Sequence, residues 1–284
     1  MLTADQLPNG VTLDQVNAWY DRFRFYRHGP SREDIVFWLN QFTDEHRPIA
    51  ARVLDQVLIL SDAEIHQGYH NALSGLAGWS IDQAQRSGRW VFVGLGGQAE
   101  SGAAMLHMFR EANRLTSDVH QGLFASLSEL PSLKLTAHDT VLFVDDFSGT
   151  GEQFSKRWET YQELVSCEAR TFLVLAAATS TALERLKANG DLQVIVEVVL
   201  GPEHNVFHDG CPIFTAQEKN HLLSYCRRAD RRKPKGWGDC GLLFVISRKT
   251  PNNSLPILHV TTRTWKGVFP RTLPIFGAPP ALAA

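Results

Sequence analysis

Short apolar runs alternate with helical patterns through the middle and end of the chain. Apolar, partly β-branched runs occupy residues 89–95, 140–144, 171–178, 193–200 and 242–247. Such runs are typical of strands covered on both faces of a parallel sheet, and the segments between several of them have helical periodicity. This alternation predicts an α/β fold, a parallel sheet with helices on both faces.

The first part of the chain has a different pattern. Apolar residues recur there at three- and four-residue intervals, which predicts helices, including one over residues 49–60. Ser31 and Asp34 resemble a capping box at the start of another helix. We therefore expect an N-terminal helical region over residues 1–87, followed by the α/β domain over residues 88–284.

The segment Thr140–Phe154, TVLFVDDFSGTGEQF, combines a strand, two acids and a glycine-containing turn. We expect the strand to end at Asp145, which places Asp145 and Asp146 where ligands of open α/β sheets bind. Residues 148–151 are small, so their amide groups can form a phosphate-binding concavity before a helix that begins near Glu152. Two carboxylates suit sugar hydroxyls or Mg²⁺. The segment therefore predicts a ribose 5-phosphate site, and a simple helix cap is the alternative.

A second glycine turn follows the strand at residues 89–95. It begins with Gly96, Gly97 and Gln98. A nucleotide triphosphatase loop is excluded, because two alanines follow Gly102 where Lys and Ser or Thr are required. A dinucleotide fingerprint is weak, since Ala99 occupies the position of its third glycine. An anion-binding loop and a structural turn without a ligand both remain open. Right-handed crossovers would place this turn at the same sheet edge as the two acids.

Composition narrows the choice of partners. The 284 residues are 44% hydrophobic and carry a formal net charge of -2, which argues against a protein that coats nucleic acid generally. The four cysteines form no close pairing motif, and no apolar run approaches the ~18 residues that cross a bilayer. The beginning of the sequence lacks a basic segment followed by an apolar one. We expect a cytoplasmic protein with reduced thiols and no membrane insertion.

Two polar segments near the end offer further sites. His204, His208 and Cys211 have the spacing H-x3-H-x2-C, which fits either part of a zinc site or ordinary loop residues. The segment Arg227–Lys235 holds six basic residues against one acid. It could bind an anion such as pyrophosphate or a nucleic acid backbone, or could be a helix end with a solvated linker. Three aromatic residues beyond it, Trp237, Trp265 and Phe269, suit either base stacking or a core.

The run VLFVDDFSGTG closely resembles the PRPP-binding signature of type I phosphoribosyltransferases. The segments ARVLDQVLILSDAEI and GLLFVISRKTPNNSLPILH resemble a phosphoribosyltransferase-like subgroup of bacterial conflict systems, often called PRTase-CE. This resemblance extends from about Val36 to Arg271.

The resemblance implies a role for each residue of the two loops. Asp145 and Asp146 would be catalytic, contacting the ribose hydroxyls and Mg²⁺, the metal directly or indirectly. The ligand-binding residues would be Phe147, Ser148, Gly149, Thr150 and Gly151, with the last four wrapping the 5-phosphate. Gly96, Gly97 and Gln98 would form the loop for pyrophosphate.

Three functions remain open. The first is Mg²⁺-dependent transfer of a 5-phosphoribosyl group from PRPP, in anti-phage or conflict defence and with a possible protein partner from a defence operon. The second is an inactive module that senses PRPP or a nucleotide and regulates a partner. Glu152, Gln153 and Gln98 favour this alternative, because they make the two loops less positive than anion sites usually are. The third is hydrolysis of the N-glycosidic bond of a nucleotide.

Overall fold

The computed structural model describes residues 6–95, 101–165 and 168–271. Its contacts divide the chain into two compact units. The sheet unit is Asp62–Glu203, and the terminal unit combines the residues up to Ser61 with those from His204 onward. This division does not coincide with the boundary expected at residue 87. No helix in the described ranges has both the length and the hydropathy to cross a bilayer.

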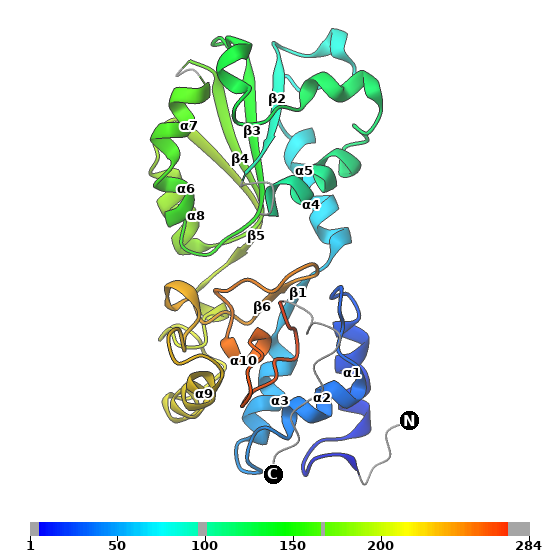
Figure 1. Ribbon diagram of the computed structural model, residues 1–284, viewed down its shortest axis with the longest axis vertical. Coiled ribbons are helices and arrows are strands. Elements are labelled where there is room, and N and C mark those ends of the chain that lie inside the picture. Colours follow the sequence, from blue (N-terminus) through cyan, green and yellow to red (C-terminus); the bar gives the residue numbers. More distant parts are fainter. Residues whose placement is uncertain (1–5, 96–100, 166–167, 272–284) are drawn as a thin grey trace. The chain divides into compact units, whose positions relative to one another are not determined.

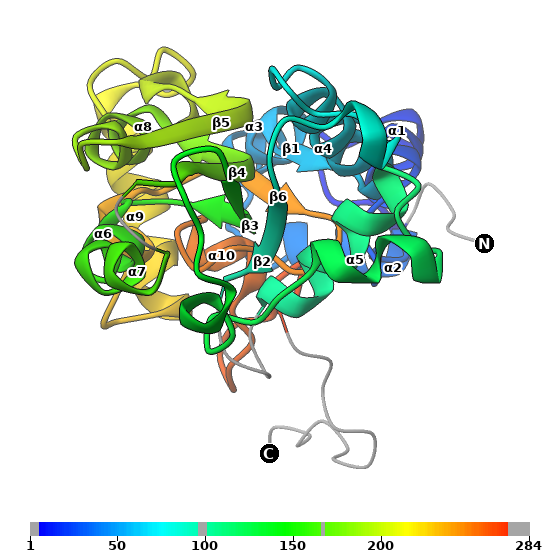
Figure 2. The ribbon, with the colours of Figure 1, turned by 90° about the horizontal axis from the view of Figure 1, so that it is seen from above.

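The sheet unit is built on four parallel strands in the order β2-β3-β4-β5. The strands are β2 (Trp90–Gly94), β3 (Thr140–Ser148), β4 (Arg170–Thr179) and β5 (Leu192–Leu200). Helices α4 (Asp62–Ser74) and α5 (Ser101–Ala112) cover one face, and α6 (Glu152–Ser155), α7 (Trp158–Val165) and α8 (Ser180–Lys187) cover the other (Figures 1 and 2). The predicted parallel sheet with helices on both faces is confirmed.

The side chains of β3 explain why it lies inside the sheet. Residues 140–144 are all buried, and successive side chains of a strand point to opposite faces. Val141 and Phe143 pack in one core with Trp158 of α7, and the ring of Phe143 also contacts that of Tyr161. An apolar run without polar alternation is what a strand covered on both faces requires.

The strand that carries the two acids is longer than predicted. β3 continues beyond Asp145 to Ser148, because Phe147 and Ser148 pair with β4. The helix predicted to begin near Glu152 does begin there, but α6 ends at Ser155 and a separate helix, α7, follows. The region between α5 and β3 contains the 3-10 helices η3 (Asp118–Leu123) and η4 (Leu130–Leu133), and Phe124 forms an isolated bridge with Phe92 of β2.

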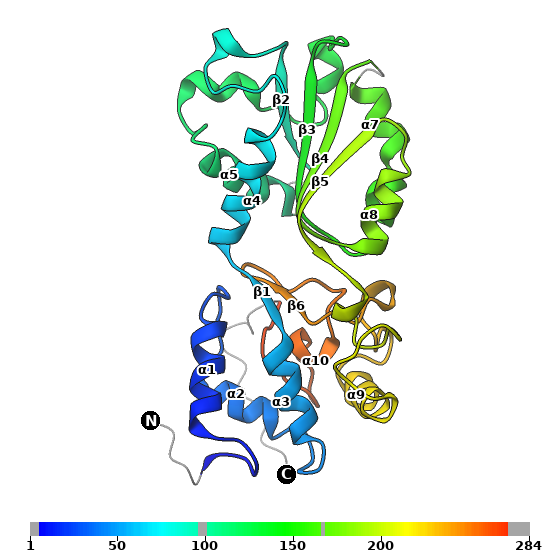
Figure 3. The ribbon, with the colours of Figure 1, turned by 180° about the vertical axis from the view of Figure 1, so that it is seen from behind.

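The terminal unit contains a small parallel sheet with helices around it (Figure 3). Its strands are β1 (Leu58–Leu60) and β6 (Phe244–Ile246). Its helices are α1 (Leu13–Phe23), α2 (Arg32–Leu39), α3 (Arg47–Gln56), α9 (Ala216–Ala229) and α10 (Pro256–His259), with short 3-10 helices η5 (Pro202–His204) and η6 (Trp237–Asp239) nearby in sequence. The N-terminal helices are confirmed, and the Ser31–Asp34 capping box is present at α2. A further 3-10 helix, η2 (Gln83–Gln85), precedes β2.

The helix predicted over residues 49–60 ends earlier than expected. Val57 has extended backbone, and Leu58–Leu60 forms β1 instead of a last helical turn. The apolar triplet Leu-Ile-Leu fits a buried helix and a buried strand equally well in sequence. Pairing with β6, far along the chain, decides between them.

Candidate functional site

The candidate site begins where β3 extends past its neighbour β2. Gly94, the last residue of β2, pairs with Val144, and the Leu95 N–H donates to the Val144 carbonyl at 3.1 Å. Asp145 and Asp146 therefore lie beyond the end of β2, although β3 still pairs with β4. Both acids are half-buried. They thus occupy the edge of the sheet at which open α/β folds bind ligands.

The two acids point in different directions. Because side chains alternate along a strand, Asp145 and Asp146 project toward opposite faces of the sheet. Asp145 Oδ1 accepts a hydrogen bond from the Asp146 amide at 2.9 Å, and Asp146 Oδ1 accepts one from the Phe147 amide at 2.7 Å. Each carboxylate is therefore fixed against the following peptide.

A buried tyrosine supports the strand at the first acid. The Tyr69 hydroxyl donates to the Asp145 carbonyl at 2.8 Å. The ring of Tyr69 is buried and packs edge-on against Phe109, and the Asn113 amide donates to the Tyr69 carbonyl. Helices α4 and α5 thus hold the backbone of the site from one side of the sheet.

The loop after β3 is held by hydrogen bonds from α8 and from Thr179, the residue that precedes α8. Helix α8 lies on the face of the sheet opposite to α4 and α5 (Figure 2). Thr179 Oγ1 donates to the Gly149 carbonyl at 2.7 Å, and Arg185 Nη1 donates to the Thr150 carbonyl at 2.9 Å. In a trans peptide the N–H points opposite to the C=O. The amides of Thr150 and Gly151 consequently face away from α8. Successive amides turned to one side are the feature that makes such loops anion sites.

Gly151 allows the loop to approach α8 closely. Its φ is +69°, a conformation that glycine adopts readily and other residues rarely do. A Cβ at this position would lie 2.9 Å from the Ala182 carbonyl oxygen. Glycine at this position therefore permits the turn, and α6 begins immediately after it, at Glu152.

Glu152 is paired at the start of α6. Its carboxylate accepts a hydrogen bond from the ammonium group of Lys156, one helical turn later. This hydrogen bond and the Lys156 charge hold the pKa of Glu152 below its ordinary value. An acid beside a phosphate loop repels the ligand less when a cation neutralises it.

The second loop is described only at its two ends. Gly96, Gly97 and Gln98 lie outside the described residues. At the flanks, a Cβ on Gly94 would lie 2.5 Å from the Gly102 carbonyl oxygen, and one on Gly102 would lie 1.5 Å from that of Leu95. The backbones that lead into and out of the loop therefore touch, which only glycine permits. The base of this loop is fixed next to Val144, one residue before the first acid.

The sequence was also compared with models of known protein families. The PRTase-CE model matches residues 35–271, most of the chain. The protein belongs to the PRTase-CE family. The match includes β3, its two acids, the following loop and most of the terminal unit. The PRTase-CE chain is thus phosphoribosyltransferase-like. A comparison with curated proteins finds no match.

The zinc alternative finds no support in the PRTase-CE chain. Among residues 6–95, 101–165 and 168–271, no three His, Cys, Asp or Glu side chains are grouped to hold a metal ion. His208 Nδ1 accepts a hydrogen bond from the Gly210 amide, and Cys211 is buried. Cys226 is also buried, which raises the pKa of its thiol to about 12 and disfavours the thiolate that zinc requires. The loop interpretation of these residues is preferred.

The basic segment Arg227–Lys235 begins inside α9. Arg227 and Arg228 lie in the last turn of that helix, where cations favour the helix dipole. Of the three aromatic residues considered for stacking, Trp265 and Phe269 belong to the core, whereas Trp237 is 44% exposed. Only Trp237 is therefore placed to contact a ligand.

Several residues that shape the site were not identified from the sequence. They are Tyr69, Thr179 and Arg185. Thr179 carries a partial signal, because a threonine between a strand and a helix predicts an N-cap, and it does cap α8. Tyr69 and Arg185 have no local signal, since each reaches the site from a helix distant in sequence.

Proposed function

We propose that the protein binds PRPP at the end of β3 and transfers its 5-phosphoribosyl group to an acceptor. The observation that carries this proposal is the loop of residues 148–151. Its carbonyls at Gly149 and Thr150 accept hydrogen bonds from Thr179 and Arg185, so the amides of Thr150 and Gly151 face the other way. This loop follows Asp145 and Asp146 directly in sequence. A 5-phosphate on these amides would leave the ribose hydroxyls near the carboxylates.

The two acids also suit Mg²⁺, which usually keeps several waters and shares its other positions with substrate oxygens. Asp145 and Asp146 would hold the ion either directly or through its waters. When bound, Mg²⁺ would neutralise charge on the pyrophosphate. The two carboxylates therefore suit a Mg²⁺ ion that is coordinated partly by the protein and partly by the substrate.

In the proposed transfer, the bond between the anomeric carbon and the pyrophosphate oxygen breaks. Its electron pair leaves with pyrophosphate, and positive charge develops at the anomeric centre. A lone pair of the acceptor forms the new bond to that carbon, and the acceptor releases a proton to water. Asp145 and Asp146 would fix the ribose, and the amides of residues 148–151 would fix its phosphate, so that orientation supplies much of the rate.

The second loop would serve the pyrophosphate. Its base is fixed beside Val144, and Gly96, Gly97 and Gln98 follow directly. We further propose that the protein acts in bacterial anti-phage defence together with a protein partner, as its PRTase-CE membership suggests.

The test is pyrophosphate release from PRPP and Mg²⁺, with candidate bases as acceptors. We expect Asp145→Asn with Asp146→Asn to abolish turnover while circular dichroism stays unchanged. The matched control is Asp118→Asn with Asp191→Asn, which removes two exposed carboxylates from the same unit. Undiminished pyrophosphate release by the first variant would contradict the proposal. Binding without release would identify a sensor, and free base formed from a nucleotide without PRPP would identify a hydrolase.

A further inference from the structure

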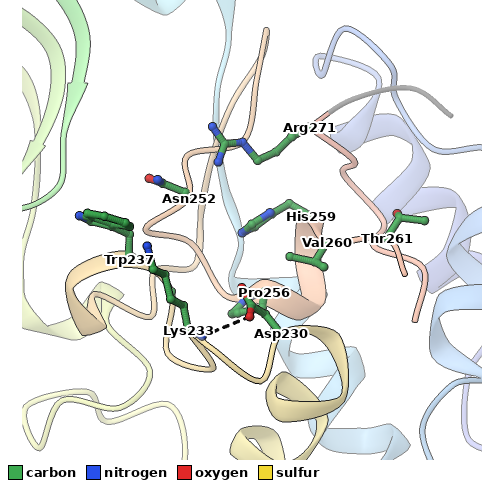
Figure 4. Close-up of a pocket in the computed structure, with 10 residues that line it drawn as sticks. Asp230, Lys233, Trp237, Asn252, Pro256, His259, Val260, Thr261 and Arg271 are labelled. Atoms are coloured by element: carbon green, nitrogen blue, oxygen red, sulfur yellow. Dashed lines mark hydrogen bonds between the residues drawn. The ribbon is translucent and has the colours of Figure 1, made fainter. Parts of the chain in front are cut away.

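The terminal unit contains a cavity of about 360 Å³ that is separate in sequence from the acids and loop of β3. Among the residues that line it are Asp230, Lys233, Trp237, Asn252, His259 and Arg271. The lining comes from the residue after α9, the basic segment, η6, a turn, α10 and the segment that follows α10 (Figure 4). The volume lies within the range of roughly 300–1,000 Å³ that is usual for small-molecule sites.

The walls of the cavity are fixed by the fold. Gly236 has a φ of +76°, and a Cβ there would lie 2.6 Å from the Asn253 carbonyl oxygen. The Trp237 amide donates to the Asn252 carbonyl at 2.8 Å. On the opposite wall, α10 is held by the indole N–H groups of Trp38 and Trp265, which donate to the Ile257 carbonyl at 2.7 and 3.0 Å. The backbone at Gly236 and Trp237 and that of α10 are thus held in place by the fold.

His259 supplies a buried acceptor to this cavity. Its side chain points toward the side where Lys233 and Trp237 lie (Figure 4), and the residue is only 8% exposed. Its Nε2 is buried and has no hydrogen-bond partner among the described residues. Since the ring also bonds to the Ser254 backbone, that bond must use Nδ1. Nδ1–H donating to a carbonyl leaves Nε2 with a lone pair, and a buried polar atom without a partner requires an explanation.

Burial, and then the charge of Arg271, lower the pKa of His259 to about 4. The imidazole is therefore neutral near pH 7. At that pH its Nε2 can accept a hydrogen bond but cannot attract an anion, so it suits an N–H group of a ligand.

Cations and an aromatic ring complete the lining. Lys233 Nζ lies 3.0 Å from the centroid of the Trp237 ring, which is partly exposed. Arg271 points to the same side (Figure 4). The one carboxylate in the lining, Asp230, accepts backbone hydrogen bonds from Arg232 and Lys233. The lining therefore holds two cationic side chains and one carboxylate, and this net positive charge favours an anion.

We propose that this cavity binds a nucleotide at a second site, distinct from the ribose phosphate site on β3. The phosphate contacts Lys233 and Arg271, the planar base lies against Trp237, and an N–H of the base donates to His259 Nε2. The basic segment Arg227–Lys235 would therefore help to bind a nucleotide. This binding does not require the β3 site to transfer a phosphoribosyl group.

The experiment is calorimetry with AMP, GMP, CMP and UMP on the full chain carrying Asp145→Asn and Asp146→Asn. In that background the β3 site is disabled, so failure of this proposal and failure of the proposed function are distinguishable. We expect at least one mononucleotide to bind, and Lys233→Gln to weaken its affinity at least tenfold. Lys233 is exposed, so its replacement leaves folding intact. Lys249→Gln is the matched control, an exposed lysine of the same unit outside the cavity lining.

Two further measurements test the base contacts. In protein labelled with ¹⁵N-histidine, the bound mononucleotide should shift the Nε2 resonance of His259, which His259→Gln assigns by its disappearance. Inorganic phosphate should bind more weakly than the mononucleotide. The proposal is overturned if no mononucleotide binds, if Lys233→Gln binds as tightly as Lys249→Gln, if phosphate alone binds equally well, or if the His259 resonance does not move.

Discussion

Asp139 fixes the amino end of β3, opposite the end that carries the candidate site. Its carboxylate accepts hydrogen bonds from the Arg89 guanidinium at 2.8 Å, from the Arg89 amide at 2.9 Å and from the Thr136 amide at 2.8 Å. Burial alone would raise the pKa of Asp139, but the hydrogen bonds from Arg89 and Thr136 hold it well below its ordinary value of 3.8. The residue is only 4% exposed. These contacts tie β3 to the residue that precedes β2.

Replacing Asp139 by Asn should lower the free energy of unfolding by about 2 kcal/mol at pH 7, since hydrogen bonds to a charged group are lost. The folded pKa is lower than the unfolded one, so the stabilisation is present above about pH 4 and is lost as pH falls below it. Urea unfolding followed at pH 7 and at pH 3 should show the difference between wild type and variant shrinking at pH 3. The exposed Asp191→Asn serves as control. An equal difference at both pH values would contradict this assignment.

At the scale of elements, the site depends on how β3, the loop of residues 148–151 and α8 meet. The sequence predicted the strand, the glycine turn and the helix start near Glu152, because each has a local signal. It did not predict that β3 runs on to Ser148, because that extension depends on pairing with β4. The hydrogen bonds of Thr179 and Arg185 to the loop were also missed, since they join segments far apart in the chain.

Gly151→Ala tests the contact between the loop and α8. The substitution places a Cβ at positive φ and 2.9 Å from the Ala182 carbonyl oxygen, so it should displace the loop and weaken PRPP binding at least tenfold. Gly190→Ala is the matched control, because Gly190 has a φ of +62° with no heavy atom within 4 Å of the added Cβ. Its cost is the strain of the left-handed backbone alone, roughly 1–2 kcal/mol. Equal PRPP affinity for the two variants, measured by calorimetry, would show that the loop position does not matter.

At the scale of the molecule, one unit is continuous in sequence and the other is not. The sheet unit, Asp62–Glu203, contains β2 to β5 and its own core. The terminal unit combines residues from before and after the sheet unit, and the pairing of β1 with β6 joins these two segments. Sequence patterns could not reveal this division, because the short run that forms β1 reads as the end of a helix and its partner strand lies far along the chain.

Residues 62–203 expressed alone should therefore fold. We expect cooperative urea unfolding, monitored by the fluorescence of buried Trp90 and Trp158, because the strands and the core around them lie within this segment. Residues 1–61 alone should not unfold cooperatively, since β1 would lack its partner β6. A gradual, non-cooperative transition of the 62–203 segment would show that the sheet unit needs the rest of the chain.

Calorimetric titration of the full chain with PRPP in the presence of Mg²⁺ tests the central claim most directly. The claim is that the carboxylates of Asp145 and Asp146, with the amides that follow, bind a phosphorylated ribose. We predict that wild type and the control Asp118→Asn with Asp191→Asn bind PRPP equally, and that Asp145→Asn with Asp146→Asn loses at least tenfold in affinity, or about 1.4 kcal/mol. Undetectable binding to wild type, or unchanged binding to the last variant, would contradict the account.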